Sequence, residues 1–286
     1  MTKHIVCLTF DHDNMSPFIS RGMTTPTAIS RGDFGIVATE RLLALCARYR
    51  IKTTWFTPGF TIESHPKICE EVVAAGHEIG HHSWAHIPPA TQTRAEEEAD
   101  LVRANEAIEK LTGAKARGYR SPSWDITPHT VSLLLKHGFL YDSSLMGHDY
   151  DCYYARQGDV AELKKPFVRG RETRLVEMPI SWSLDDYPHF EYMRNPNGSI
   201  QAGLMNANNV LENFVDDFTY MTEVCPEFGI LTYTFHPHVI GRGHRMMMLE
   251  RLIQKLMEDG AVFMTMETAM GEWLARRQAG RKQAAE

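Results

Sequence analysis

The chain is organised around the stretch Gly76-His77-Glu78-Ile79-Gly80-His81-His82-Ser83-Trp84-Ala85-His86, which holds four histidines within ten residues. His82 and His86 are separated by three residues, and on a helical turn positions i and i+4 share a face. Both imidazoles could therefore point at one cation. The apolar and glycine residues before them predict a strand that runs into a loop, and enzymes built on parallel strands keep their chemistry at strand ends. The alternative is a surface loop whose histidines bind nothing.

Outward from this stretch, strand patterns alternate with helix patterns. We expect strands at residues 4–10, 52–56 and 77–80, separated by helices at 36–49 and 64–74, with Ser64 as the N-cap of the second helix. The alternation continues downstream, with helices at 93–112, 128–137, 206–224, 249–257 and 267–276 and strands at 117–120, 139–144, 175–179, 229–235 and 261–264. Strands that alternate with helices in this way predict an α/β protein with parallel strands.

Three segments interrupt the alternation. Residues 14–35 show no periodicity, and a long structureless stretch in a compact domain is usually a lid or binding loop. Arg21 or Arg31 in this segment could contact a polar substrate, or each could be an exposed loop charge. Residues 146–174 form an aromatic excursion that we expect to cover part of the active-site mouth or to make a subunit contact. The polar tail, residues 278–286, is predicted to be disordered.

Composition narrows the function classes. The 286 residues allow one barrel-sized domain or two small ones, and the net charge of −6 without a basic stripe disfavours nucleic-acid binding. We find no signal peptide and no apolar run long enough to span a membrane. The five cysteines are widely spaced and form no Cys-x-x-Cys pair, which is typical of reduced thiols. A cytoplasmic location is therefore expected.

Four predicted strand ends offer polar side chains that could share one site: Asp11 with Asp13, His82 with His86, Arg120, and His236. One carboxylate and two histidines make a three-ligand set with open positions for water or substrate, as catalytic metal centres require. The other carboxylate would be free to act as a base, and an arginine beside it would keep it ionised. A histidine across the site could donate a proton to a leaving nitrogen.

These motifs, in this order, resemble the polysaccharide deacetylase superfamily, also called the NodB-homology domain: Thr9-Phe10-Asp11-His12-Asp13, the histidine stretch, Arg120-Ser121-Pro122-Ser123-Trp124 and Thr234-Phe235-His236-Pro237-His238. The resemblance implies an irregular (β/α) barrel of about seven parallel strands, with residues 1–277 as one domain. It also implies these roles: Asp11 as general base, Asp13, His82 and His86 as metal ligands, Arg120 as tether of the base, and His236 as general acid. We expect the metal to be Zn²⁺.

Two departures indicate a particular branch of the superfamily. His12 lies between the two aspartates, where the secreted sugar deacetylases carry adjacent aspartates, and we expect no export signal. The chain thus resembles a cytoplasmic branch of cyclic imide hydrolases, allantoinase-like enzymes and peptidoglycan deacetylase-like proteins. We expect hydrolysis of a carbon–nitrogen bond in a small cyclic imide or ureide. The alternatives are an N-deacetylase of acetylated sugar or peptidoglycan fragments, a non-haem Fe(II) oxygenase, and a non-catalytic barrel.

Further residues complete the expected site. We assign substrate contacts to five side chains: Trp84, Trp124, Trp182, Asp186 and Arg31. His77 and His81 fall outside the ligand set, the first as a structural residue at the strand start and the second as a neighbour that lines the site. By resemblance, the protein is expected to be a homo-oligomer, for example a tetramer, that acts on a small molecule.

Overall fold

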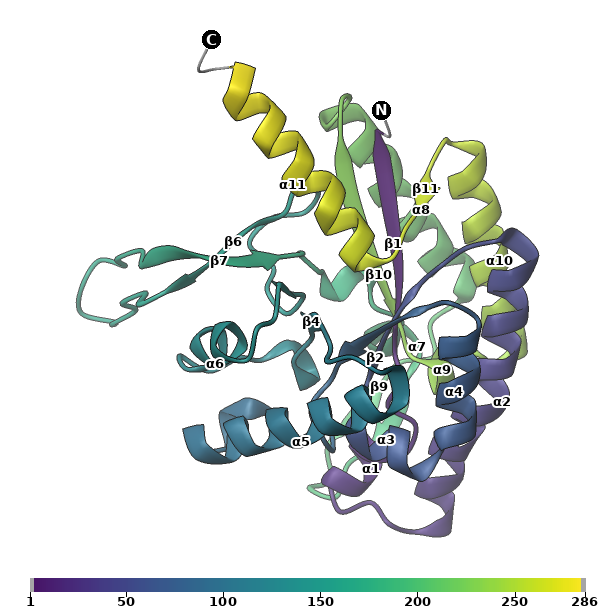
Figure 1. Cartoon of the computed structure of the whole chain (residues 1–286). Helices are drawn as coiled ribbons and strands as arrows, with labels where there is room; N and C mark the ends of the chain where they lie inside the picture. The colour runs from purple at the N-terminus through teal and green to yellow at the C-terminus, as the bar shows by residue number, and fades with distance from the viewer. Residues whose placement is uncertain (1–2, 284–286) are drawn as a thin grey trace.

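A computed structural model describes residues 3–283 and shows one curled sheet with helices packed around it (Figure 1). Nine strands form this sheet in the order β10-β1-β2-β3-β4-β5-β7-β6, with β11 paired to β1. These strands are β1 (His4–Asp11), β2 (Thr54–Thr57), β3 (Glu78–His81), β4 (Gly118–Tyr119), β5 (Tyr141–Asp142), β6 (Tyr153–Gln157), β7 (Arg171–Glu177), β10 (Gly229–Phe235) and β11 (Val262–Phe263). A separate antiparallel pair consists of β8 (Tyr192–Arg194) and β9 (Ile200–Ala202).

The parallel pairing brings the carboxyl ends of the strands to one edge. From β10 to β7, every pair of neighbours in the sheet is parallel, and only β6 runs antiparallel to its neighbour β7. The expected set of about seven parallel strands is therefore confirmed. The curl is incomplete in the described residues: a single bridge between Asp185 and Thr234 joins the segment after β7 to β10. The architecture is thus an irregular (β/α) half-barrel.

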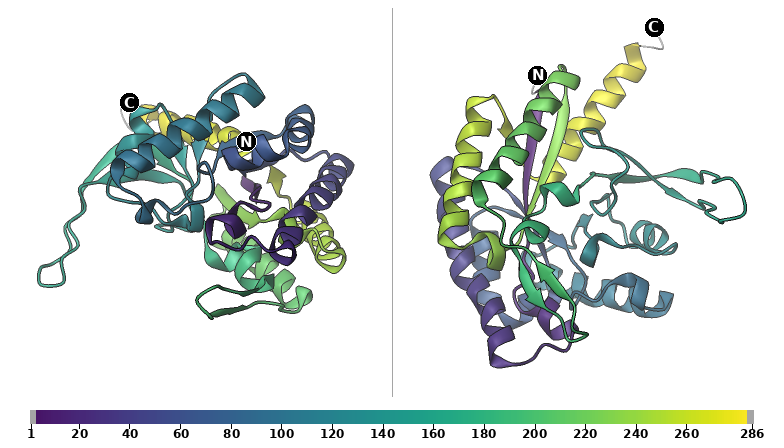
Figure 2. Two further views of the ribbon diagram at one scale, coloured as in Figure 1. Left: turned by 90° about the horizontal axis from the view of Figure 1, so that it is seen from below. Right: turned by 180° about the vertical axis from the view of Figure 1, so that it is seen from behind.

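Helices cover the outside of the sheet (Figure 2). They are α1 (Ser16–Ser20), α2 (Pro26–Tyr49), α3 (Gly59–Ser64), α4 (Pro66–Ala74), α5 (Arg94–Thr112), α6 (Thr130–Lys136), α7 (Asp186–Phe190), α8 (Ala207–Val224), α9 (Pro237–Ile240), α10 (Gly243–Glu258) and α11 (Met266–Gln283). Strand β10 is buried along its whole length, as expected for a parallel strand covered on both faces. Leu8 of β1 and Leu42 of α2 belong to one continuous apolar core between sheet and helices.

The predicted helix at 93–112 is confirmed almost to the residue. Thr93 caps α5 through a capping box with Glu96, in which each side chain binds the backbone N–H of the other residue. Gly113 ends the helix in the left-handed region, at φ 82°. Local capping chemistry decided both ends, which is why the sequence alone could locate them.

The predicted loop at 14–35 is wrong, because most of it is helical. Helix α2 begins at Pro26, where the sequence analysis placed its start near residue 36, and the Thr25 side chain caps it by accepting from the Ala28 N–H. The glycines that suggested a loop serve close packing. A Cβ on Gly35 would lie 2.1 Å from Asn14 Oδ1, and one on Gly32 would lie 2.5 Å from the Met15 Cα. Helix α2 thereby presses against the residues that follow β1.

Three smaller expectations also change. Ser64 does not cap a helix, because it ends α3 and His65 is the N-cap of α4. The excursion at 146–174 contains β6 and the start of β7, a hairpin that extends away from the body of the molecule (Figure 1). Residues 278–283, expected to be disordered, continue α11, since Ala, Arg, Lys and Gln are good helix formers; 284–286 lie outside the described residues. Within residues 3–283, no helix has the length and apolar character that crossing a membrane requires.

Candidate active site

The ends of four parallel strands converge as expected. Asp11 ends β1, and Asp13 follows two residues later. His82 comes directly after β3, Arg120 directly after β4, and His236 directly after β10. Because these strands are parallel, their carboxyl ends lie at one edge of the sheet, and the side chains meet there.

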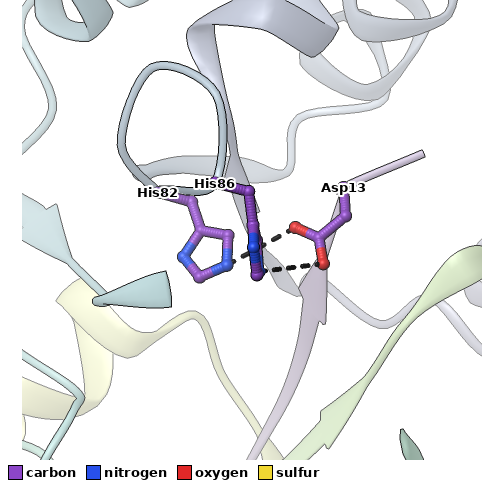
Figure 3. A group of neighbouring side chains, drawn as sticks. All are labelled: Asp13, His82 and His86. Atoms are coloured by element: carbon purple, nitrogen blue, oxygen red, sulfur yellow. Dashed lines mark ion pairs between the residues drawn. The ribbon is translucent and has the colours of Figure 1, made fainter. Parts of the chain in front are cut away.

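Asp13, His82 and His86 form a cluster with the geometry of a metal-binding site (Figure 3). His82 Nε2 lies 3.4 Å from Asp13 Oδ1, and His86 Nε2 lies 3.5 Å from Asp13 Oδ2. His82 Nδ1 donates to the Arg120 carbonyl at 2.8 Å, which leaves Nε2 as the free lone pair. Both His82 Nε2 and Asp13 Oδ1 are buried without a hydrogen-bond partner. Two buried ligand atoms that face each other without hydrogen-bond partners are suited to binding a divalent metal.

Protonation of the cluster also suits a metal. Burial, aided by the neighbouring His82, Arg21 and His236, lowers the pKa of His86 well below its usual range. His86 is therefore neutral at physiological pH and can offer a lone pair. Burial raises the pKa of Asp13, and the carboxylate of Asp11 adds to this effect, while His82 and His236 oppose it. A bound cation would offset the cost of burying the negative charge of Asp13.

The two histidines reach one another through a turn and not through a helix, which corrects the expected i, i+4 geometry. Strand β3 ends at His81, and both Ser83 and His86 adopt left-handed backbone conformations, at φ 61° and φ 57°. The Ser83 hydroxyl accepts the His86 N–H at 2.8 Å and closes the turn. The rings stand 5.1 Å apart between centroids. Such strain in non-glycine residues is typical of functional sites.

Asp11 stands beside the cluster as an ionised carboxylate. Arg120 Nη1 donates to Asp11 Oδ1 at 2.7 Å, and both side chains are fully or almost fully buried. Burial alone would raise the pKa of Asp11, but Arg120, His82 and His236 outweigh it and hold the pKa below its usual range. Arg120 is itself fixed by Thr9 Oγ1 and by the carbonyl and hydroxyl of Ser143. Asp11 Oδ2 points toward the histidines, 3.8 Å from His82 Nε2.

His236 faces the carboxylates from the end of β10, the strand paired with β1. Its Nε2 lies 3.9 Å from Asp11 Oδ2 and 3.9 Å from Asp13 Oδ2. Its Nδ1 donates to Asp186 Oδ1 at 2.8 Å, and its backbone N–H donates to the same oxygen at 3.0 Å. Burial alone would lower the pKa of His236, but the surrounding carboxylates, with Asp185 and Asp186 foremost, raise it well above its usual range. The imidazole is thus held as a proton donor whose Nε2–H points into the site.

A cavity of about 230 Å³ opens over these groups. Its floor is formed by Asp11, Asp13, His86 and His236, and its other lining residues are Pro17, Arg21, Ser123, Trp124, Trp182, Asp185, Tyr187, Pro188 and Gln201. The rings of Trp124 and Trp182 stack with centroids 4.1 Å apart and form one flat wall. Of the five expected substrate contacts, these two tryptophans are brought to the cavity.

The other three expected contacts lie outside the cavity lining. The guanidinium of Arg103 lies over the indole ring of Trp84, with Arg103 Cζ 3.5 Å from the ring centroid. Arg31 is engaged by the Glu191 carboxylate and the Tyr192 carbonyl. Asp186 is completely buried behind His236, so it orients that imidazole and does not reach the substrate space.

The remaining histidines of the opening stretch are structural. His81 was expected to line the site, but it is completely buried, and its Nε2 donates to the Leu101 carbonyl at 3.0 Å. Strand alternation turns its side chain to the helix side of the sheet, away from the site. His77, expected to be structural, precedes β3 and accepts the Thr53 N–H through Nδ1.

Six cavity residues were not predicted as site residues from the sequence: Pro17, Ser123, Asp185, Tyr187, Pro188 and Gln201. Ser123 lies inside the motif 120–124, and Asp185 and Tyr187 flank the predicted Asp186, so the neighbourhood of these three was a usable signal. Gln201 lies on the short strand β9, and nothing in its local sequence distinguishes it. Arg21, which the sequence analysis named as a possible contact, does line the cavity.

Comparison with known proteins identifies the family of this chain. Residues 1–141 match the family model described as polysaccharide deacetylase. A peptidoglycan deacetylase of Helicobacter pylori is 35% identical over 267 residues, which cover 89% of this chain and 90% of that protein. Among solved structures, one from Mycobacterium smegmatis described as a polysaccharide deacetylase matches with a TM-score of 0.83 and 28% identity, covering 96% of this chain and 92% of that one.

The fold recurs at lower sequence identity. A structure of Puue allantoinase matches with a TM-score of 0.74 and 21% identity, covering 96% of this chain and 90% of that one. The Helicobacter pylori relative aligns across nearly the whole of both chains. The chain belongs to the polysaccharide deacetylase family, and it is a hydrolase of the kind that acts on carbon–nitrogen bonds.

Proposed function

We propose that the protein is a metal-dependent N-deacetylase that acts on an acetylated sugar or peptidoglycan fragment. One observation carries the chemistry: an ionised carboxylate, Asp11, and a protonated histidine, His236, face each other across a three-ligand metal cluster in one cavity. Hydrolysis of an amide needs this pair, since one group must take a proton from water and another must give one to the leaving nitrogen. The name of the Helicobacter pylori relative supports an N-acetyl substrate.

The residues divide the reaction between them. Asp11, kept ionised by Arg120, takes the proton of the attacking water. His236, kept protonated by the carboxylates behind it, donates its Nε2 proton to the departing amine. The stacked Trp124 and Trp182 line one side of the cavity and offer the substrate an apolar surface. A metal held by Asp13, His82 and His86 supplies Lewis acidity and acidifies bound water.

The donor set favours Zn²⁺ as the metal, because two imidazoles and one carboxylate suit zinc in catalytic sites. The same three ligand types also bind Fe(II) in oxygenases. The paired Asp11 and Arg120 favour the hydrolase, since an oxygenase has less need of a tethered base. Metal analysis by mass spectrometry of the purified protein distinguishes the two: iron with oxygen consumption would overturn the hydrolase.

A second candidate is ring opening of a cyclic imide or ureide. The cavity favours it, because a space of about 230 Å³ with a flat aromatic wall is sized for a small planar ring. The chemistry is the same in both candidates: a water adds to a carbonyl, and a nitrogen leaves. They differ in whether the leaving nitrogen stays attached to the product through the ring.

A substrate panel separates the two candidates. The metal-loaded enzyme is given N-acetylated sugars and muropeptide fragments, together with succinimide, hydantoin, dihydrouracil and allantoin. We expect acetate release from the first group, measured by an enzyme-coupled acetate assay. Ring opening without acetate release would replace our proposal with the second candidate. Asp11→Asn is the control for catalysis, since it should abolish turnover of any true substrate and leave the metal bound.

A further inference from the structure

Arg21 is a cation on the cavity wall that forms no ion pair with a carboxylate of residues 3–283, although its charge helps to lower the pKa of the nearby Asp13. Its Nη1 donates to the Tyr187 hydroxyl at 3.2 Å and contacts Met193 Sδ at 3.8 Å. Among the described residues, neither its Nε nor its Nη2 has a hydrogen-bond partner, and no carboxylate forms an ion pair with it. The free edges of the guanidinium are therefore available to a ligand in the cavity that Arg21 lines.

Other arginines around the site are already engaged. Arg120 is bound to Asp11, Arg31 to Glu191, and Arg245 to the carbonyls of Val239 and Phe190. Arg31 and Arg245 thus stabilise the fold, and Arg120 keeps Asp11 ionised. Arg21 differs because its strongest partner is a neutral hydroxyl, so its charge remains available.

The backbone holds Arg21 at a fixed place relative to the metal cluster. One short helix, α1, separates it from Asp13, and the Ser16 N–H and hydroxyl both donate to the Asp13 carbonyl, at 3.0 and 2.9 Å. The Arg21 N–H donates back to the Phe18 carbonyl at the end of that helix. On the other side, the Tyr187 ring that receives the Arg21 hydrogen bond lies 5.1 Å from the His236 ring. Arg21 is thus built into the same frame as the ligands and the acid.

We propose that Arg21 is a specificity residue that binds a carboxylate of the substrate, so that the enzyme prefers N-acyl substrates with an acidic group near the scissile amide. This inference rests on the proposed function for the identity of the scissile bond. A guanidinium offers two parallel N–H donors that match a carboxylate, and such charge-assisted pairs are stronger in a partly buried, aromatic cavity than in water. A neutral isostere would leave the Arg21 charge without a partner.

Binding measurements test the preference directly. The probes are N-acetylmuramic acid, an acetylated sugar that carries a carboxylate, and its carboxamide, which has nearly the same shape without the charge. Isothermal titration calorimetry is run on the metal-loaded protein. We expect the acid to bind about 10- to 100-fold more tightly than the carboxamide, as charge-assisted hydrogen bonds usually provide. Equal affinity, or no binding of the acid, would overturn the proposal.

Three variants locate the effect. Arg21→Gln removes the charge but retains an N–H donor for Tyr187, and it should abolish the preference. Arg31→Gln removes a nearby arginine that lies outside the cavity, and it should leave the preference intact. Tyr187→Phe removes the hydroxyl but keeps the Arg21 charge, so the preference should also persist. If Tyr187→Phe removed it as fully as Arg21→Gln, Arg21 would serve only to hold Tyr187. A carboxylate preference that survives Arg21→Gln would show that the metal binds the acid, and this too would contradict the proposal.

Acetate release, measured separately, distinguishes this inference from the proposed function. If the acid binds preferentially through Arg21 but no acetate appears, the N-deacetylase assignment fails and the role of Arg21 stands. If acetate is released from both probes with the same kcat/KM, the assignment stands and the role of Arg21 fails.

Discussion

Replacing Arg120 with methionine tests the electrostatic basis of the site. The guanidinium is completely buried, lies 2.7 Å from Asp11 and 4.2 Å from the Phe56 ring centroid, and donates to Thr9 and Ser143. Arg120→Met keeps a long apolar side chain in that space but leaves the Asp11 carboxylate buried and unpaired. Removing one member of a buried ion pair costs about 3–5 kcal/mol of unfolding free energy.

The pH dependence identifies the cause of that loss. In the wild type, the pKa of Asp11 is lowered, so its pairing stabilises the fold above the unfolded value of about 3.9 and is lost as the pH falls through the folded value. In Arg120→Met, burial is no longer opposed by Arg120, and the pKa of Asp11 should rise. The difference in stability between variant and wild type should therefore be largest near neutral pH and shrink below about pH 4.

Urea unfolding at several pH values measures the effect, with Arg117→Met as the matched control. Arg117 lies three residues away and pairs with Glu267 at 2.6 Å, but its side chain is 60% exposed. An exposed pair contributes about 0–1 kcal/mol, so the control should lose little stability. The double variant Asp11→Asn/Arg120→Met should lose less than the sum of its two single variants, since neither charge is then left alone.

Catalysis should follow the same logic. A less ionised Asp11 cannot serve as the base near neutral pH, and kcat/KM should fall by about 10²- to 10⁴-fold, with its acidic limb moved to higher pH. If Arg120→Met lost no more stability than Arg117→Met, or if its acidic limb stayed in place, the assignment of Arg120 as the partner that ionises Asp11 would be refuted.

Three further outcomes are expected. His82→Ala should lose the metal, measured by mass spectrometry, while circular dichroism shows an intact fold; full metal content would remove His82 from the ligand set. Asp186→Asn should lower the pKa of His236, because it weakens the charged partner of Nδ1, and should move the basic limb of kcat/KM to lower pH; an unmoved limb would contradict the role of His236 as the acid. The third outcome concerns Asp142, whose pKa burial raises to about 6. The wild type should therefore lose roughly 2 kcal/mol of stability as the pH rises from about 4 to 7, and Asp142→Asn should not show this loss. Thermal melts at pH 5 and pH 8 measure it. If the variant and the wild type lost the same stability between these two pH values, the raised pKa of Asp142 would be refuted.

Asp11 and Asp13, two residues apart in one short segment, have different surroundings, which suit the two different roles proposed for them. Asp11 and Asp13 are both buried, and two such carboxylates cannot both ionise without compensation. Asp11 receives its compensation from Arg120, which donates a hydrogen bond to it, whereas Asp13 has no arginine hydrogen bond and faces His82, His86 and, at 3.9 Å, His236. The segment therefore makes one carboxylate a base and leaves the other to a cation.

Local sequence predicted those features that depend on neighbours along the chain. The helix at 93–112 could be placed because its capping box and terminal glycine lie within it. Strand ends could be located from apolar runs followed by polar residues. Parallel connectivity then implied that Asp11, His82, Arg120 and His236 would meet, because parallel strands end at one edge.

The errors arose where distant segments decide the local structure. Gly32 and Gly35 looked like loop residues, but α2 needs them to approach Met15 and Asn14. Trp84 lies two residues from the ligand His82 and still points away from the cavity, onto Arg103. Asp186 was expected to contact substrate, but its burial behind His236 makes it an orienting group.

The amino-acid sequence alone predicted the fold class and the four motifs, since these depend on residue type and on the period of the local pattern, and the family resemblance of the motifs supplied the candidate ligands, base and acid. Only the tertiary structure decided which way each side chain points. The half-barrel brings Arg21 to the cavity wall without an ion-pair partner among residues 3–283, while it pairs the half-buried Arg31 with Glu191. Both arginines come from the same stretch of sequence. They differ because the partners that compete for a guanidinium come from segments more than 150 residues away.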